Sequence, residues 1–364
     1  MQRWKTARRI VAAVALLLAT LGASRSAQAK GEGPQMVVDA QAGHLFVARA
    51  ANAITMVDIT SGRVLRTVSI GGPPFAMAVD AHTSRLFVIT TTGPSGSFAV
   101  LDTRTGALLR TGPTIGSPQA IAVDGATNRA FVLSSMATVH VLNAQTGVVL
   151  HRGTTHLAVY TVAVAQRSHH IFVGGADNVG VVAVLDARTG ALLHTSGGPP
   201  RNDVGGGPMA VDNQTGHVFA LGDRGVTMLD AVSGRVVQTV AVGPNPWAIV
   251  SDERTGHVFV STATGVQMMD ARSGRVLHVT APANTFEQLA IDERAHRAIA
   301  VATDDSLWLI DTRSGAVVHR LAGAGGTSLA VDEQRGRIFV RTTDGVHALN
   351  TDTGTLLHTI TVGS

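Results

Sequence analysis

A glycine recurs about every 40 residues along most of this chain, always four residues after an aspartate or asparagine. The stretch LDARTGALLH begins at Leu185, and LDTRTGALLR at Leu101, LDAVSGRVVQ at Leu229, MDARSGRVLH at Met269 and IDTRSGAVVH at Ile310 repeat it. The eight glycines are Gly62, Gly106, Gly147, Gly190, Gly234, Gly274, Gly315 and Gly354. A fixed period of this length indicates a repeat architecture in which each copy is one supersecondary unit.

Each copy contains four short runs rich in Val, Ile, Leu, Ala and Phe, separated by Gly, Pro, Asn, Asp and Ser. Four strands in about 40 residues are typical of a β-propeller blade. We therefore predict an all-β fold, a propeller of eight blades that begin near residues 35, 75, 119, 160, 207, 247, 287 and 327. Because blades pack face to face, this fold accounts for 45% hydrophobic and only 15% charged residues.

Residues 1–29 have the pattern of a signal peptide. A basic start is followed by an apolar run that is too short to span a bilayer comfortably, and then by the small residues of a cleavage site at Ala27–Ala29. We expect cleavage after Ala29, a single propeller domain over residues 30–364, and an exported protein that is periplasmic or extracellular. An uncleaved membrane anchor is the alternative.

Charge and cysteine content restrict the function classes. Five of the 29 Lys and Arg residues lie in the predicted leader and no Asp or Glu does, which leaves 24 basic against 25 acidic residues. This balance gives no signal for nucleic-acid binding. The chain has no cysteine, which excludes disulfides, thiol catalysis and cysteine-ligated metals. We expect no cofactor, no stable membrane insertion after cleavage, and a monomer.

The stretches PFAMAVDAHTSRLFVITT and FAVLDTRTGALLRT, with their counterparts in the other copies, resemble the YVTN family of exported bacterial propellers. The resemblance covers the whole chain after the leader. Members of that family commonly have seven blades, so seven is the alternative to the eight that the copies predict. The resemblance implies a binding or interaction protein.

The repeated Asp-x-x-(Ser/Thr)-Gly motif has two interpretations. Its carboxylate can accept hydrogen bonds from backbone N–H groups of a turn whose glycine has positive φ, or a set of such carboxylates can bind calcium. Asn143 and Asn350 replace the aspartate in two copies and keep the acceptor without the charge. The substitutions favour a turn.

Most of the 15 histidines also occupy repeat positions. His44, His170, His217 and His257 share one position with Arg85, Arg129, Arg297 and Arg337. Since arginine cannot replace histidine as a metal ligand, we expect no metal site there and interpret the position as a solvated strand position.

The channel mouth is the first candidate binding site. Phe75, Tyr160 and Trp247 share a position five residues before the aspartate that ends the innermost strand, Glu287 occupies it in the seventh copy, and Phe286 lies beside it. Aromatic side chains with one carboxylate are typical of a small-molecule or peptide site. Wedge packing between blades is the alternative.

Irregular loops on the same face give further candidates. The longest insertion carries Arg201, Asn202 and Asp203, and Asp177 lies in a neighbouring hairpin loop. Loops that depart from a regular scaffold often carry binding residues, although a tolerated surface insertion explains the same observation.

We therefore expect an exported, non-catalytic propeller that binds an unknown small molecule, peptide or protein on its variable-loop face and channel mouth. A propeller hydrolase or lyase of the lactonase type is one alternative, with Glu287, His156 and Arg201 in catalytic roles. A quinoprotein-like dehydrogenase is another, but its docking motif has a tryptophan where this chain has Leu or Val.

Overall fold

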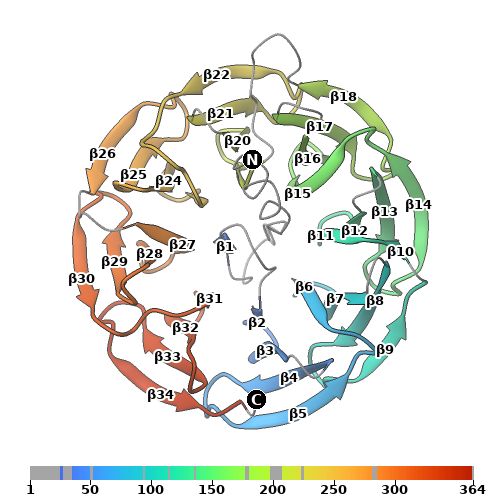
Figure 1. Ribbon diagram of the computed structural model, residues 1–364, viewed down its shortest axis with the longest axis horizontal. Coiled ribbons are helices and arrows are strands. Elements are labelled where there is room, and N and C mark those ends of the chain that lie inside the picture. Colours follow the sequence, from blue (N-terminus) through green and yellow to red (C-terminus); the bar gives the residue numbers. More distant parts are fainter. Residues whose placement is uncertain are drawn as a thin grey trace, which may run out of the picture.

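The computed structural model describes residues 25–27, 35–49, 52–92, 95–113, 115–134, 137–176, 180–196, 207–222, 225–280 and 285–362. Eight antiparallel sheets surround a central channel, each with its innermost strand at the channel and its outermost strand at the rim (Figure 1). The predicted all-β propeller with eight blades is therefore confirmed. The described residues form no helix, and thus none that is long and apolar enough to cross a membrane.

The first four blades occupy the N-terminal half of the chain. Blade 1 contains β2 (Met36–Asp39), β3 (His44–Arg49), β4 (Ala53–Asp58) and β5 (Val64–Ser69). Blade 2 contains β6 (Pro74–Asp80), β7 (Arg85–Thr92), β8 (Ser95–Asp102) and β9 (Leu108–Thr111), with the short β10 (Ile115–Gly116) beside β8. Blade 3 contains β11 (Pro118–Asp124), β12 (Arg129–Ser134), β13 (Thr138–Asn143) and β14 (Val149–Thr154). Blade 4 contains β15 (Ala158–Ala165), β16 (His170–Ala176), β17 (Gly180–Asp186) and β18 (Leu192–Ser196).

The other four blades complete the ring. Blade 5 contains β19 (Met209–Asp212), β20 (His217–Gly222), β21 (Gly225–Asp230) and β22 (Val236–Val240). Blade 6 contains β23 (Ile249–Asp252), β24 (His257–Thr262), β25 (Gly265–Asp270) and β26 (Val276–Thr280). Blade 7 contains β27 (Phe286–Asp292), β28 (Arg297–Ala302), β29 (Leu307–Asp311) and β30 (Val317–Leu321), and β1 (Arg25–Ala27) pairs with β27. Blade 8 contains β31 (Ser328–Asp332), β32 (Arg337–Arg341), β33 (Val346–Asn350) and β34 (Leu356–Ile360).

The three inner strands of a blade are buried along most of their length, whereas the outermost strand is mostly exposed. Strand β4, for example, is buried from Ala53 to Val57, while β5 exposes all but one of its residues. Inner strands pack against neighbouring blades on both faces, so they read as continuous apolar runs instead of alternating ones. The predicted core phenylalanines, such as Phe46 and Phe339, are fully buried.

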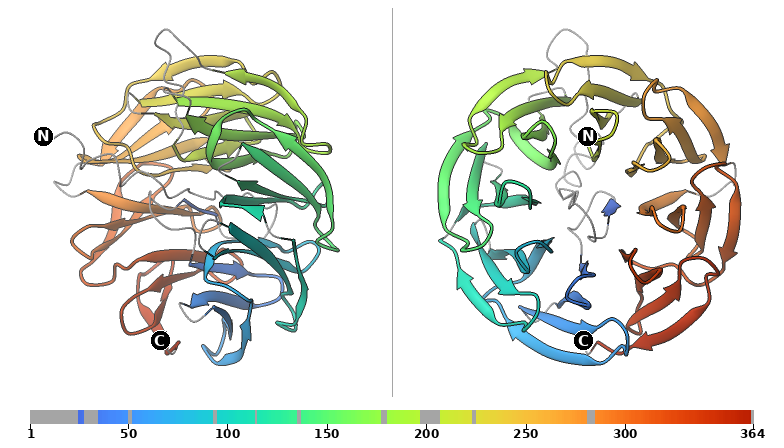
Figure 2. Two further views of the ribbon diagram at one scale, coloured as in Figure 1. Left: turned by 45° about the vertical axis from the view of Figure 1, so that its right-hand side comes forward. Right: turned by 180° about the vertical axis from the view of Figure 1, so that it is seen from behind.

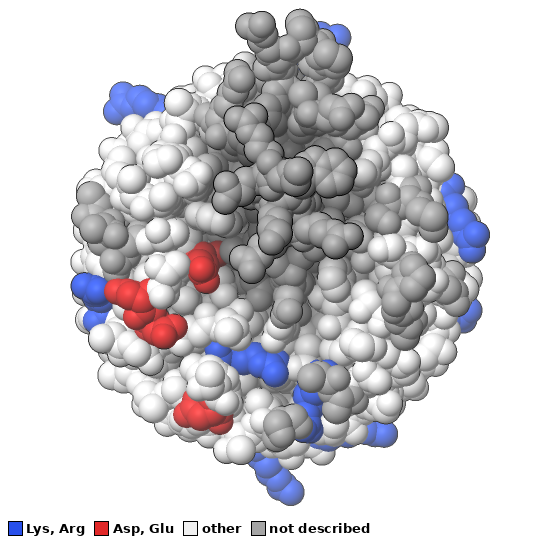
Figure 3. Space-filling model, in the orientation of Figure 1, with Lys and Arg blue, Asp and Glu red and all other residues white. Residues whose placement is uncertain are grey.

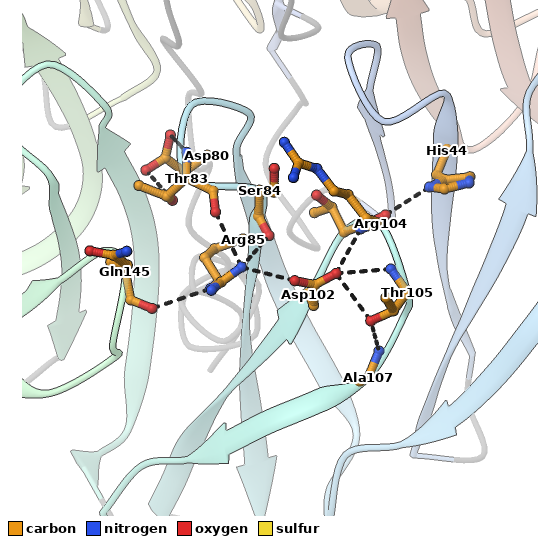
Figure 4. A network of polar contacts seen from close by, with 11 residues as sticks. His44, Asp80, Thr83, Ser84, Arg85, Asp102, Arg104, Thr105, Ala107 and Gln145 are labelled. Atoms are coloured by element: carbon orange, nitrogen blue, oxygen red, sulfur yellow. Dashed lines mark hydrogen bonds and ion pairs between the residues drawn. The ribbon is translucent and has the colours of Figure 1, made fainter.

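The repeated motif is a turn in all eight copies. In blade 2 the carboxylate of Asp102 accepts hydrogen bonds from the backbone N–H groups of Arg104 (3.0 Å) and Thr105 (2.9 Å) (Figure 4). Gly106 has φ +68°. The pairing of β8 with β9 shifts register between Val100 and Leu101, as a turn with a β-bulge requires. Asn143 accepts the equivalent bonds through its amide oxygen. The interpretation of the motif as a turn is confirmed.

Because strands alternate in direction, the turns after the first and third strands of every blade lie on one face of the disc. We call this the turn face. The loops between blades and the hairpins between second and third strands lie on the opposite face, the loop face. Figure 1 views the disc from one of these faces, and the right-hand panel of Figure 2 views it from the other.

The interpretation of the His/Arg position as solvated is wrong. These side chains are half-buried, and most of them bridge to the next blade. The Nδ1 atom of His44 lies 2.7 Å from the carbonyl oxygen of Thr103, and Nε of Arg85 donates to the carbonyl oxygen of Gln145 at 3.2 Å (Figure 4). Histidine and arginine alternate here because both can donate to a backbone carbonyl across the seam between blades.

Blades 1 and 8 close the ring without a shared strand. Their seam contains an apolar cluster that includes Met36, Leu45 and Phe339. Three arginines of blade 8 also donate to carbonyl oxygens of blade 1: Arg335 to Ala40 (2.9 Å), Arg341 to Ala48 (2.6 Å) and Arg337 to Ile59. The ends of the ring are therefore joined by packing and by side-chain hydrogen bonds.

Candidate binding surface

The carboxylates of the turn face are engaged in the fold. Those of the outer turns, such as Asp270, accept hydrogen bonds from the turn backbone and a serine or threonine hydroxyl, and the Ser273 hydroxyl lowers the pKa of Asp270. Those of the inner turns are fully buried, and burial raises the pKa of Asp212, Asp292 and Asp332. Within the described part of the chain, no group of three or more His, Asp or Glu side chains is arranged to hold a metal.

At the channel mouth on the loop face, the innermost strand is bulged in four blades. The register shifts between Pro74 and Ala76, between Pro118 and Ala120, between Val159 and Thr161, and between Phe286 and Gln288. The residues within these bulges are Phe75, Gln119, Tyr160 and Glu287. A β-bulge redirects a side chain at the end of a strand and is frequent next to functional sites.

Three of these four residues belong to the predicted site, and Gln119 was missed. Gln119 is neither aromatic nor acidic, although it too lies five residues before its blade's aspartate, Asp124. Its side chain is buried, and its amide nitrogen donates to the Ser117 hydroxyl at 3.2 Å. The position of Gln119 in the repeat is therefore the sequence signal that identifies it as a residue of the mouth.

The aromatic residues of the mouth combine packing with exposure. Phe75 and Tyr160 are half-buried, and each packs against an apolar cluster that includes residues of blade 3. Trp247 is half-buried as well, and its Nε1 atom is buried without a hydrogen-bond partner among the described residues. Part of each ring is therefore buried, and only the remainder is accessible at the mouth.

Phe286 lies in the core instead of at the mouth. Its side chain is fully buried and meets Trp308 edge-on, with ring centroids 5.6 Å apart. The Arg320 guanidinium lies 4.8 Å from the centroid of Trp308, and the indole N–H donates to the Ser306 hydroxyl at 2.7 Å. These contacts assign Phe286 to the packing of blade 7.

The described acidic residues of the loop face gather over blades 7 and 8, where Figure 3 shows red surface beside the channel and nearer the rim. Glu287 is exposed at the mouth, and Asp304, Asp305 and Asp344 occupy hairpin loops. Asp304 forms an ion pair with Arg320 at 2.9 Å. The Thr342 hydroxyl lowers the pKa of Asp344, and His347 adds to this effect. This sector of the face carries negative charge.

The remaining predicted site residues, Asp177, Arg201, Asn202 and Asp203, lie outside the described residues. Of the residues considered for catalysis, His156 is an exposed residue with φ +58° between blades 3 and 4, whereas Glu287 belongs to blade 7. The described structure does not bring a catalytic set together.

Solved structures with the same fold include natural and designed propellers. A computationally designed protein, Ika8, has a TM-score of 0.66 at 15% identity, over 95% of this chain and 98% of the other. BamB from Moraxella catarrhalis has a TM-score of 0.63 at 17% identity, over 90% and 99%. The dihydro-heme d1 dehydrogenase NirN, in complex with DHE, has a TM-score of 0.64 at 15% identity, over 81% and 66%. At these identities the likeness concerns the fold alone.

No curated protein matches the chain. The resemblance of the repeat to the YVTN family remains a prediction, since the family that matches is a different one. The match extends over residues 122–321, from blade 3 to blade 7, and covers more than half of the chain. On this evidence the chain belongs to the propeller family described as outer membrane protein assembly factor BamB.

Proposed function

We propose that this chain is an exported, non-catalytic propeller that binds an extended peptide segment of a protein partner at the channel mouth of its loop face. The observation that carries the proposal is the set of bulged strand starts, where Phe75, Tyr160 and Glu287 stand at the same repeat position of three blades. Membership of a family described as an assembly factor supports a protein partner.

The chemistry of the mouth favours an apolar and basic peptide. Half-exposed aromatic rings offer apolar contact area with little loss of side-chain entropy. Glu287 and the acidic loops of blades 7 and 8 supply negative charge on one side of the opening. Charge complementarity of this kind raises the association rate and selects against acidic competitors.

Export is part of the proposal. It is supported by the leader pattern of residues 1–29 and by the outer-membrane role that the family description names. In the described structure, β1 from this leader pairs antiparallel with β27, with Ala27 opposite Leu289. Removal of residues 1–29 opens that edge of β27 at the channel.

A thermal-shift screen of the exported protein tests the proposal. The panel contains apolar-basic peptides, acidic peptides of equal length, sugar lactones and pyrroloquinoline quinone. A peptide present at 100 times its dissociation constant stabilises the folded state by roughly 2.7 kcal/mol. We expect stabilisation by apolar-basic peptides that Tyr160→Ala and Glu287→Gln reduce and that Arg188→Gln, on the turn face, leaves unchanged. Stabilisation by lactones or the quinone alone would contradict the proposal.

A further inference from the structure

The exposed charged residues of the turn face are nearly all arginines. Eleven of its arginines are exposed, and among its described acidic residues only Asp352 is exposed. The arginines are Arg63, Arg104, Arg167, Arg188, Arg235, Arg254, Arg272, Arg275, Arg294, Arg313 and Arg335. They are distributed over seven of the eight blades, and five of them lie on blades 6 and 7.

The acidic residues of this face lie deeper than these arginines, because the fold uses them in its turns. Asp58 and its counterparts bind their own turns, and the inner-turn aspartates are buried. The Glu293 carboxylate accepts a hydrogen bond from the backbone N–H of Glu253 in the neighbouring blade at 2.9 Å. Within the described residues, Arg335 is the only one of the eleven arginines in an ion pair, with Asp332.

An aliphatic belt borders the same face. Every large hydrophobic side chain that is exposed in the described structure belongs to an outermost strand or to the turn that leads into it. The belt comprises Val64, Leu65, Leu108, Leu109, Val148, Leu150, Leu193, Val232, Val236, Val237, Leu277, Val279, Val317, Val318, Leu356 and Leu357. Most of these residues lie within four positions of a turn glycine, and Val232, in the turn itself, is 68% exposed.

We propose that the turn face docks on the surface of an anionic phospholipid bilayer. A flat bilayer can meet the arginines of several blades at once, whereas a linear polyanion would follow only one path across the disc. Arginines near an anionic membrane surface attract phosphate groups, and exposed aliphatic side chains add apolar contact at the headgroup boundary. A soluble polyanion offers no apolar surface that the aliphatic belt could contact.

The opposite charge of the loop face fixes the orientation. The acidic sector over blades 7 and 8 is repelled by an anionic surface, so the loop face points away from the membrane and toward the solvent (Figure 3). This inference concerns the other face of the disc and does not rest on the proposed peptide site.

Vesicle flotation of the exported protein tests the proposal. The vesicles contain phosphatidylglycerol and phosphatidylcholine in equal parts, or phosphatidylcholine alone. We expect partition into the anionic vesicles only. A variant with Arg254→Gln, Arg272→Gln and Arg275→Gln, none of which has a side-chain hydrogen bond in the described structure, should lose about 100-fold of that partition.

The control variant Arg110→Gln, Arg152→Gln and Arg320→Gln removes the same charge from outermost strands beyond the turns, and it should lose much less. A third variant, Val232→Ser with Val236→Ser and Val237→Ser, should weaken partition at unchanged net charge. Equal losses in the two arginine variants would overturn the proposal. So would an absence of partition, or binding to a single-stranded DNA oligonucleotide without binding to vesicles.

Discussion

The closing seam provides the sharpest test of how the ring is held together. Arg337 of blade 8 donates from its guanidinium to the carbonyl oxygen of Ile59 in blade 1, and lies 3.4 Å from that of Thr60. No strand is shared across this seam. Arg337→Met keeps much of the apolar stem and removes the donors, so the substitution isolates the hydrogen bonds.

The magnitude follows from the chemistry of the contact. A hydrogen bond in which one partner is charged contributes about 1.5–3 kcal/mol, and the half-buried position of Arg337 places it at the lower end. We therefore expect Arg337→Met to lower the free energy of unfolding by about 2 kcal/mol. Because the chain is large, this corresponds to a decrease in Tm of about 3 °C.

Arg275→Met is the control. Arg275 is exposed on the turn face of blade 6, and its guanidinium has no hydrogen bond among the described residues. The control should cost less than about 0.5 kcal/mol in urea and thermal unfolding. Equal losses in the two variants would refute the claim that bonds across the closing seam hold the ring.

Two turn carboxylates should respond to pH in opposite ways. Burial raises the pKa of Asp292, so its contribution to stability is present at low pH and lost as pH rises through the folded-state pKa. Asp292→Asn should therefore raise Tm at pH 7, with a gain that vanishes in acid; a loss at pH 7 would contradict this. The pKa of Asp270 is lowered by the Ser273 hydroxyl, so its contribution is present at neutral pH and lost as pH falls through the folded-state pKa. Asp270→Ala should cost about 1 kcal/mol at pH 7, whereas Asp270→Asn, the residue type at Asn143, should cost little in thermal unfolding; equal costs would show that the acceptor is unimportant.

The repeat made the fold predictable from the sequence. Glycine at a fixed offset from an acceptor side chain marks a turn with positive φ, and the structure has that φ at each of the eight glycines, from +65° to +73°. Four strands in each copy then predict a β-propeller, whose blades are four-stranded sheets. Asn143 and Asn350 decided between a turn and a calcium site because they retain the hydrogen-bond geometry without the charge.

The contacts between blades were not predictable in this way. The shared position of His44 and Arg85 identified a common requirement, but only the structure shows that the requirement is a carbonyl oxygen of the next blade. Phe286 lies one residue from the bulged position of Glu287, and that single step separates a core side chain from an exposed one. In a β-strand, adjacent residues face opposite sides.

The net charge of the chain did not predict how unevenly charged residues are distributed over the surface. Counting residues gives a chain close to neutral after the leader, because each turn aspartate counts as much as an exposed arginine. The turn aspartates are half-buried or buried where they bind their turns, whereas the arginines are exposed. A net charge near zero therefore coexists with a basic face and an acidic sector on the face opposite.

The central claim, that a protein partner binds at the mouth of the loop face, is tested most directly by site-specific photo-crosslinking in the exporting cell. A photoreactive residue is placed at Tyr160 or Trp247 on the loop face, and at Arg104 or Arg188 on the turn face as the matched control. We predict that the two loop-face positions crosslink to the same discrete protein and that the turn-face positions do not. Crosslinks to that protein from the turn face alone, or no protein adduct from any of the four positions, would contradict the account.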